Sequence, residues 1–224
     1  MMNNGFEVRP VNYRERIQFR CTCCGDCCRH IEESVMLESL DAYRLAKYLR
    51  QIDPYVKNIE DALAKYAAPI LLTDNGFPVY VLKTWGEDDA CIFLKENRCS
   101  VYPARPRTCR LYPLTAAPAS NGQLCYFLCR DKPHHFVGDS IRVRDWVKEH
   151  FKREDQEFLI EEYARIPRLG QAMKQIKEDD LARAIVLVMF RRYYNYDLDA
   201  PFLPQFCRNM EALQHEMEQL IKQD

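Results

Sequence analysis

Cys21-Thr22-Cys23-Cys24-Gly25-Asp26-Cys27-Cys28 is the stretch that decides how this chain is built. Five of its eight residues are cysteine, and ten of the chain's eleven cysteines lie between Cys21 and Cys129. Free cysteines in ordinary cores behave as small buried hydrophobes and do not crowd in this way. Thiolates are soft ligands, so crowded thiols indicate a metal ion, an iron–sulfur cluster or disulfides.

The spacing within this loop favours a metal centre. Cys21, Cys24 and Cys27 form C-x2-C-x2-C, the spacing of bacterial ferredoxin loops that hold a four-iron cluster. Zinc sites more often use separated cysteine pairs, so the spacing favours iron–sulfur over zinc. Cys28 directly follows Cys27 and ligates either a second metal or the same polynuclear centre. Cys23 is predicted to be a spectator thiol.

A second group of cysteines follows at irregular intervals that match no single simple motif. Its members are Cys91, Cys99, Cys109, Cys125 and Cys129. Four thiols from each group would supply two tetrahedral sites, or one larger cluster with spare thiols. The alternative is that each is a buried core residue. Five thiols within 39 residues, interleaved with prolines, argue against that alternative.

The segment 97–130 carries five arginines and no lysine, aspartate or glutamate. A thiolate centre is net negative, so Arg105, Arg107 and Arg110 are predicted to offset its charge and donate hydrogen bonds to sulfur. Two other interpretations stay open. One is an anion or phosphate site, and the other is stacking of arginine on Tyr102 and Tyr112.

Three histidines, His30, His134 and His135, lie near the cysteine groups in sequence. Histidine is a common metal ligand, and any of them could complete a site. Histidines of this kind are more often exposed or act as hydrogen-bond partners, and we predict that role here.

Length and charge limit the class of protein to which the chain can belong. A chain of 224 residues fits one domain, or one domain with a helical extension. A net charge of −1 indicates no nucleic-acid partner, and the longest apolar run, 184–190, is too short to cross a membrane. Residues 1–20 contain no signal or transit peptide pattern. We therefore predict a cytoplasmic protein, where reduced thiols favour metal or redox chemistry over disulfides.

Patterns of apolar residues predict short elements before residue 139 and helices after it. Strands are expected at 35–37, 77–82 and 91–94. One helix is expected with Ser39 as its cap, and another from Asp53-Pro54 to about Tyr66. The prolines between 103 and 118 predict loops and short helical turns.

Several separate helices are expected in the second part. They comprise one around 146–151, one over 158–166 that stops at Pro167, a buried one over 181–194, and a last amphipathic one that opens at Pro204. The predicted fold class is α+β, mainly α. Residues 1–138 would form a small, loop-rich cysteine-cluster domain with short strands, and residues 139–224 a helical extension packed on it.

Two elements of the sequence occur in an order that resembles the YkgJ-like cysteine-cluster family. These are the CxxCxxCC of 21–28 and Cys99-Ser100-Val101-Tyr102-Pro103-Ala104-Arg105-Pro106-Arg107-Thr108-Cys109-Arg110, and the resemblance covers 19–130. That family is described as chelating zinc or iron, so the resemblance implies metal binding. The cysteines it carries over are Cys21, Cys24, Cys27, Cys28, Cys91, Cys99, Cys109 and either Cys125 or Cys129. Cys23 and Cys207 are extra.

The predicted function is a metalloprotein that binds an iron–sulfur cluster or zinc through thiolates, with a structural, redox or metal-handling role. One alternative is a transferase related to protein methylation, since the family is similar to part of the flagellin lysine-N-methylase. The chain has seven glycines and no glycine-rich loop after a strand to hold a nucleotide-like cofactor. The other alternative is an interaction module that uses the carboxy-terminal helices to bind a protein partner.

Overall fold

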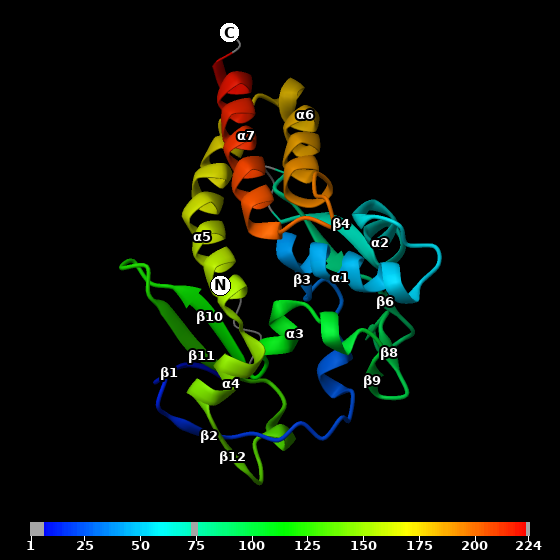
Figure 1. The fold of residues 1–224 in the computed structure, drawn as a ribbon, viewed down its shortest axis with the longest axis vertical. Helices are drawn as coiled ribbons and strands as arrows, with labels where there is room; N and C mark the ends of the chain where they lie inside the picture. Colours follow the sequence, from blue (N-terminus) through cyan, green and yellow to red (C-terminus); the bar gives the residue numbers. More distant parts are fainter. Residues whose placement is uncertain (1–6, 73–75, 223–224) are drawn as a thin grey trace.

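The structure is a computed structural model that describes residues 7–72 and 76–222 (Figure 1). Its class is α+β, mainly α, as predicted. The α-helices are α1 (Ser39–Ile52), α2 (Ile59–Tyr66), α3 (Arg107–Leu111), α4 (Val143–His150), α5 (Arg153–Met173), α6 (Glu178–Met189) and α7 (Phe202–Lys222). Three short 3₁₀ turns, η1 (Asp26–Cys28), η2 (Tyr102–Ala104) and η3 (Pro133–His135), and one π-helical turn, η4 (Phe190–Tyr194), complete the helical elements.

The strands of the described ranges are short and form five small antiparallel sheets. The longer ones are β1 (Glu7–Val11), β4 (Ala67–Leu71), β5 (Pro78–Leu82), β10 (Leu114–Pro118) and β11 (Leu124–Arg130). The others are β2 (Arg16–Gln18), β3 (Met36–Leu37), β6 (Thr84–Trp85), β7 (Ala90–Cys91), β8 (Leu94–Lys95), β9 (Arg98–Cys99) and β12 (Ser140–Arg142). The sheet orders are β1-β11-β10, β3-β5-β4, β12-β2, β6-β7 and β8-β9.

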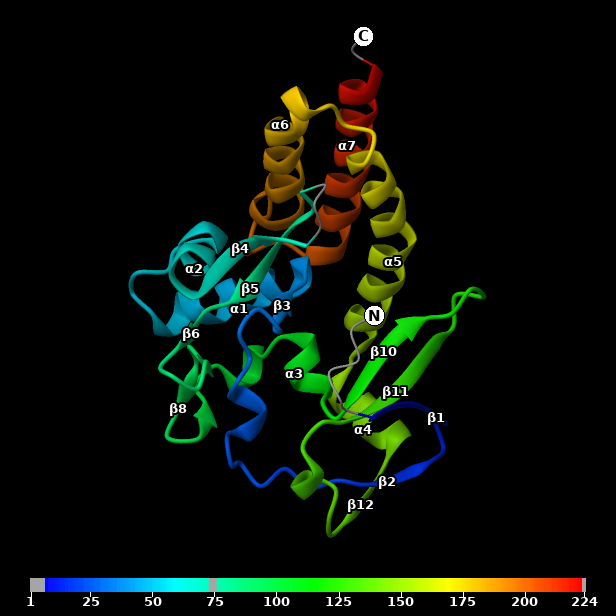
Figure 2. The same ribbon diagram turned by 180° about the vertical axis from the view of Figure 1, so that it is seen from behind.

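Helices α5, α6 and α7 stand together at one end of the molecule, and the sheets lie toward the other end (Figures 1 and 2). α7 packs against both α5 and α6. Its predicted apolar stripe is confirmed, because Met210, Leu213, Met217 and Leu220 are all buried. No helix within the described ranges has both the length and the apolar character needed to cross a membrane.

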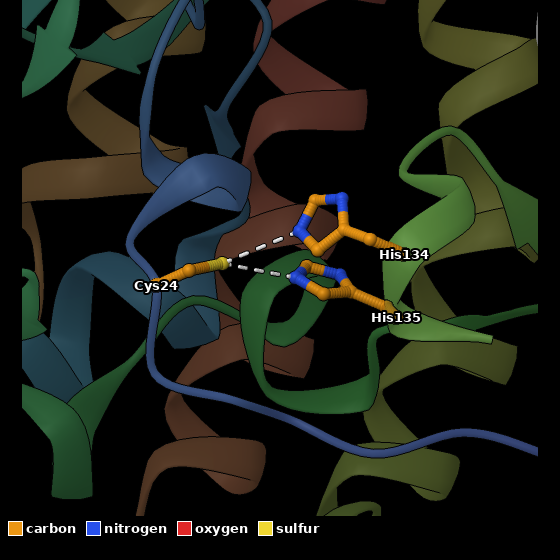
Figure 3. Close-up of side chains that lie close together, drawn as sticks. All are labelled: Cys24, His134 and His135. Carbon is orange, nitrogen blue, oxygen red and sulfur yellow. Dashed lines mark hydrogen bonds between the residues drawn. The ribbon is translucent and has the colours of Figure 1, made fainter. Parts of the chain in front are cut away.

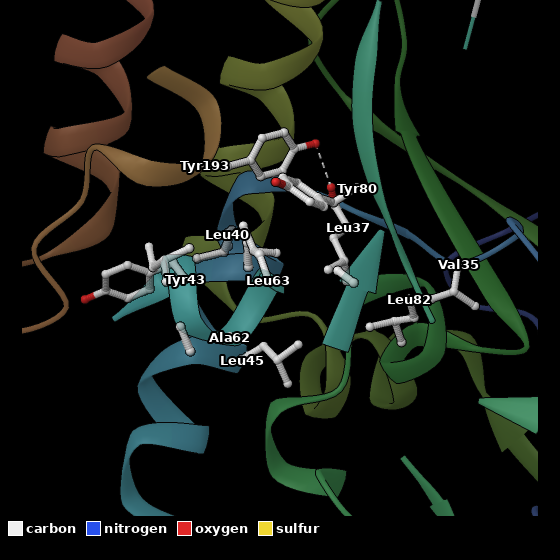
Figure 4. Packing of buried hydrophobic residues seen from close by; sticks show 14 of the residues in the cluster. Val35, Leu37, Leu40, Tyr43, Leu45, Ala62, Leu63, Tyr80, Leu82 and Tyr193 are labelled. Atoms are coloured by element: carbon white, nitrogen blue, oxygen red, sulfur yellow. Dashed lines mark hydrogen bonds between the residues drawn. The ribbon is translucent and has the colours of Figure 1, made fainter. Parts of the chain in front are cut away.

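The larger core forms where α1 and α2 cover the β3-β5-β4 sheet. Every residue of β5 is buried, because β3 and β4 flank the strand and helices pack beside it. Figure 4 shows Leu40 and Leu63 from the two helices close to Tyr80 and Tyr193. The Tyr193 hydroxyl donates a hydrogen bond to the Leu37 carbonyl over 3.0 Å, which satisfies a polar atom inside this core.

Both hydrophobic clusters combine residues from before and after position 139. The larger cluster includes Val101 and Phe206, and the smaller one includes Leu128 and Phe151. The carboxy-terminal helices therefore share their cores with the amino-terminal part. The division into domains 1–138 and 139–224 stays a prediction.

The helix predicted to begin at Asp53-Pro54 is wrong. Asp53 ends α1, and its carboxylate accepts hydrogen bonds from the Tyr55 backbone N–H over 3.1 Å and from Lys65 over 2.6 Å. α2 begins five residues later, after Asn58, whose side chain accepts from the Asp61 N–H over 2.8 Å. The Asp-Pro pair thus forms a turn, and Asn58 is the true cap.

Other boundaries differ for local reasons. α5 continues through Pro167, where the missing N–H would have paired with the carbonyl of Tyr163, a residue with a 46 % exposed side chain on the solvent side of the helix. The helix predicted over 181–194 divides into α6 and the π-helical turn, and Val186 is 65 % exposed, so α6 is not buried all round. The cap of α1 is Glu38, one residue before the predicted Ser39.

Two strand predictions were incomplete. The strand expected at 91–94 is instead the ends of two hairpins, β7 and β8, with a turn between them. The segment 114–118, expected as loop, is β10, and it pairs along β11. Proline is tolerated there because β10 is an edge strand.

Candidate metal centre

A turn at Gly25 fixes the conformation of the cysteine-rich loop, residues 21–28. Gly25 has a φ of +82° and precedes η1, and its carbonyl accepts a hydrogen bond from the Cys28 N–H over 2.9 Å. Arg29 then ties the loop to the neighbouring hairpins, since its guanidinium pairs with Asp88 and donates to the Asn97 side chain over 3.0 Å. The loop is therefore fixed against the segment that carries Cys91 and Cys99.

Five thiols from four separate segments influence one another beside this loop. Cys27 and Cys28 lie in η1, Cys91 in β7, Cys99 in β9 and Cys109 in α3, and we call these five the thiol cluster. The Sγ atoms of Cys27 and Cys28 are 3.9 Å apart. Two-residue strands and a five-residue helix present these thiols, so little regular structure supports them.

The pKa values show that the thiols act on one another. Burial, and then electrostatic repulsion from Cys91, Cys99 and Cys27, raises the pKa of Cys109. Burial, with repulsion from Cys99 and Cys27, raises the pKa of Cys91 to about 11. Cys27 differs, because the hydrogen bond with the Cys28 thiol lowers its pKa to about 7. Thiolates crowded in this way repel one another, and a cation bound among them would remove that cost.

Cys24 belongs to a different group (Figure 3). Its Sγ lies 3.2 Å from Nε2 of His135 and 3.5 Å from Nε2 of His134, both from η3. The three ligand atoms all lie within 4.8 Å of one another, and we call these residues the Cys/His triad. His135 is 2 % exposed. Burial opposes ionisation of Cys24, but hydrogen bonds with His135, the Asp26 backbone and His134 lower its pKa to about 6.

Sequence reasoning expected these histidines to be exposed or to act as hydrogen-bond partners. Both do hydrogen-bond to Cys24, and together with it they also present a possible ligand set. The separation of 110 residues between Cys24 and His134 hides this juxtaposition in the sequence. The only local signal is the adjacent pair of histidines after Pro133, in a short 3₁₀ turn.

The remaining predicted ligands lie apart from these two groups or at their edges. Cys21 is exposed, and its pKa is raised by burial and by repulsion from Cys23 and Cys27. Cys125 is exposed on β11. Cys129, four residues further along that strand, has a pKa raised by burial and by Asp131, whose charge also acts on Cys27. Between the two candidates for a last ligand, Cys129 thus shares a charged neighbour with the thiol cluster.

The three predicted arginines have different partners. Arg105 stacks on Tyr102, with its guanidinium carbon 3.5 Å from the ring centroid. Its charge contributes to the lowered pKa of Cys27 and opposes the rise that burial causes in the pKa of Cys99. Arg107 forms a bidentate ion pair with Glu38, in which Nε and Nη2 donate to the carboxylate over 2.8 and 2.6 Å. Arg110 pairs with Asp155 over 2.6 Å. Only Arg105 of these three acts on the thiols, and the other two join α3 to α1 and α5.

A cavity of about 260 Å³ lies beside α3. Arg107 and Thr108 line it together with Asp41 from α1 and Arg192 and Tyr193 from the π-helical turn. Of the three predicted arginines, Arg107 alone is part of its wall.

Replacing Gly25 with alanine is expected to destabilise the protein and weaken metal binding. The new Cβ would lie 3.2 Å from Asn97 Oδ1 and 3.3 Å from Asn97 Cα, at a φ of +82°. We expect a loss of about 2–3 kcal/mol in the free energy of unfolding, from backbone strain and crowding together. Gly122→Ala is the matched control, since its φ is +76° and nothing lies within 4 Å. Equal losses in denaturant unfolding of both variants would show that crowding against Asn97 does not hold the loop.

Comparison with known proteins gives one match. A family model named CxxCxxCC, described as "Putative zinc- or iron-chelating domain", matches residues 20–137. The match covers more than half of the 224 residues and contains the thiol cluster and the Cys/His triad. No curated protein and no solved structure matches the chain.

Proposed function

The chain belongs to the CxxCxxCC family, and from that premise we propose that it is a metalloprotein whose thiol cluster holds a zinc ion with a structural role. Four of the five thiols in the cluster would complete a tetrahedral site. The spare thiol is then available to exchange with a ligand. All eleven cysteines are free, which suits a reducing compartment, and we propose a cytoplasmic location.

The distance of 3.9 Å between the Sγ atoms of Cys27 and Cys28 carries this proposal. Two thiolates on one tetrahedral zinc, with bonds of about 2.3 Å, lie roughly 3.8 Å apart. In a four-iron cluster each thiolate binds a different iron, which separates the sulfurs further. Cys24, one member of the spacing that favoured iron–sulfur, faces two histidines instead. The geometry therefore supports zinc over the iron–sulfur centre that spacing alone favours.

A structural role fits the elements that carry the thiols. They come from a 3₁₀ turn, two hairpins of two-residue strands and the short helix α3. Such elements bury little apolar surface of their own and need a cross-link to hold a fixed arrangement. A metal bound by all four segments would supply it, because site formation and folding are then one event.

A catalytic role is the second candidate, and the cavity beside α3 favours it. Its volume of about 260 Å³ and its charged lining suit a small polar ligand. The residues in its wall that carry charge are Glu38, Asp41, Arg107 and Arg192. If the protein is an enzyme, the zinc would fix the position of α3 and thereby the shape of the cavity. Loss of zinc would then change the cavity without any bond between metal and substrate.

Purification without oxygen, followed by elemental analysis, sulfide determination and an absorption spectrum, tests the metal. We expect a colourless protein with zinc and without acid-labile sulfide, because the thiol cluster is all sulfur and zinc has no visible transitions. A brown protein that contains iron and stoichiometric sulfide would show that the centre is an iron–sulfur cluster and not a zinc site. A folded protein without bound metal would contradict the proposed function.

A further inference from the structure

We propose that Cys24, His134 and His135 form a second metal site, which binds one zinc ion separately from the thiol cluster. The site would be mixed, with one thiolate and two imidazoles, where the thiol cluster is all sulfur. Its ligands come from the cysteine-rich loop and from η3. The inference stands on the geometry of these three side chains and does not depend on which metal the thiol cluster holds.

The sulfur of Cys24 already has the separations from the two imidazole nitrogens that a tetrahedral ion requires. With zinc–sulfur bonds of about 2.3 Å and zinc–nitrogen bonds of about 2.0 Å, a sulfur and a nitrogen on one ion lie roughly 3.5 Å apart. The Cys24 Sγ atom lies 3.2 Å from Nε2 of His135 and 3.5 Å from Nε2 of His134. Both imidazoles present the same nitrogen to the same sulfur (Figure 3). A metal would thus bind with little movement of the ligands.

The groups behind His135 fix its orientation for coordination. The Tyr112 hydroxyl donates a hydrogen bond to Asp131 over 2.8 Å, and its oxygen lies 3.1 Å from Nδ1 of His135. Since Tyr112 uses its proton on Asp131, its oxygen accepts the proton of His135 Nδ1. Nε2 is then the nitrogen that is free to give a lone pair to a metal. A carboxylate linked to a ligating histidine in this way is the usual outer support of zinc sites.

Aromatic packing restrains the same imidazole. Phe19, which is 4 % exposed, contacts the His135 ring edge-on, with centroids 6.2 Å apart. Tyr112 also meets this ring edge-on at 5.8 Å. His135 is therefore held by packing on its faces and by a hydrogen bond at Nδ1, and only Nε2 is directed at Cys24. A ligand restrained before the metal arrives loses little entropy on binding.

One side of the triad is open to solvent. The side chain of His134 is 46 % exposed, and its Nε2 lies 3.2 Å from Oδ2 of Asp26, which is equally exposed. Three protein ligands leave a fourth position of a zinc ion to water or to a neighbouring group such as this carboxylate. We therefore expect the metal of the triad to exchange with chelators faster than the metal of the thiol cluster.

The competing explanation is a thiolate–imidazolium ion pair that binds no metal. This ion pair accounts for the short contacts, but it needs one imidazole and does not explain why a second imidazole contacts the same sulfur. One thiolate and two imidazoles are a donor set that zinc favours. The test must therefore count metal and identify the ligands, because either explanation predicts the same contacts in the metal-free protein.

The experiment compares the chain with the variant His134→Ala/His135→Ala, each purified after expression with zinc. We expect two zinc ions in the unaltered protein and one in the variant, with the imidazole signal lost from the zinc X-ray absorption spectrum. His215→Ala is the control, since this exposed histidine on α7 forms a hydrogen bond with Gln219 of the same helix and should change neither readout. Cys24→Ser is a second variant, expected to lose the same ion, in case the double variant does not fold.

The outcomes separate this inference from the proposed function. An unchanged zinc count in both His134→Ala/His135→Ala and Cys24→Ser overturns the second site and leaves the thiol cluster intact. A Cys109→Ser variant that keeps one zinc with imidazole ligands supports the second site even if the thiol cluster binds no zinc. A spectrum of the unaltered protein with sulfur ligands alone would also overturn it.

Discussion

Replacing Cys109 with serine is expected to remove the metal of the thiol cluster and to lower the free energy of unfolding by about 4 kcal/mol. That figure is the linkage for a metal present at about a thousand times its Kd. Cys109 carries a thiol whose pKa is raised by burial and by Cys91, Cys99 and Cys27, so it lies among the other ligands. A serine hydroxyl is a far weaker zinc ligand and keeps its proton at neutral pH.

Urea unfolding and zinc analysis of the same sample measure both effects. Cys207→Ser is the matched control, because Cys207 lies on α7, outside the family match and away from the cysteine-rich loop. It is expected to keep all its zinc and most of its stability. Removal of zinc from the unaltered protein by a chelator should lower stability by a similar amount. A Cys109→Ser variant with unaltered zinc content and stability would contradict the assignment of the thiol cluster.

Patterns of apolar residues predicted the elements whose burial is regular. The stripe of α7 and the apolar run of β5 both occur where expected, because one face of α7 and every residue of β5 are buried. Proline and aspartate were less informative. Asp53-Pro54 has the composition of a helix start, but the carboxylate of Asp53 is occupied by Lys65 and Tyr66 at the end of α2. The residues next to Asp53 in the sequence do not indicate this tertiary contact, so it could not be predicted from them.

The site was predictable in composition and not in arrangement. Cysteine density and spacing indicated a metal centre, since thiols crowded in this way are typical of metal sites. They could not show that Cys24 faces away to a pair of histidines in η3. That arrangement depends on the turn at Gly25 and on the position of η3 after β11. The arginines were harder still, because Arg107 and Arg110 pair with carboxylates that lie more than forty residues away.

The second large effect is expected at a buried ion pair that joins α5 to the π-helical turn. Arg192 Nη2 lies 2.5 Å from Glu162 Oε1, and the two side chains are 5 % and 6 % exposed. Within the part of the chain that the structure describes, Glu162 Oε2 and Arg192 Nε and Nη1 have no hydrogen-bond partner. Each charge is thus compensated mainly by the other, and removal of one leaves the other buried and unpaired.

Glu162→Ala is expected to lower the free energy of unfolding by about 3–5 kcal/mol, because the Arg192 guanidinium would remain buried and charged. The exposed pair Arg153–Glu157 on the same helix gives the matched control, since the Arg153 side chain is 91 % exposed. Arg153→Ala should cost about 0.3–0.5 kcal/mol. Similar losses for the two variants in urea unfolding would show that the buried pair contributes no more than a surface pair.

The stability of Arg192→Met is expected to depend on pH in a different way from that of Glu162→Ala. This difference tests whether an unpaired buried charge causes the loss of stability. Burial raises the pKa of Glu162 even while Arg192 opposes the shift, so without Arg192 the pKa rises further. A carboxyl whose pKa is higher in the folded than in the unfolded state favours folding at low pH and loses that stability as pH rises. The Arg192→Met variant should therefore be least stable, relative to the unaltered chain, at pH 8 and recover toward pH 5. Glu162→Ala leaves a guanidinium that cannot lose its proton, so its deficit relative to the unaltered chain should not recover toward pH 5. A deficit that is independent of pH in both variants would mean that Glu162 stays ionised when its partner is removed.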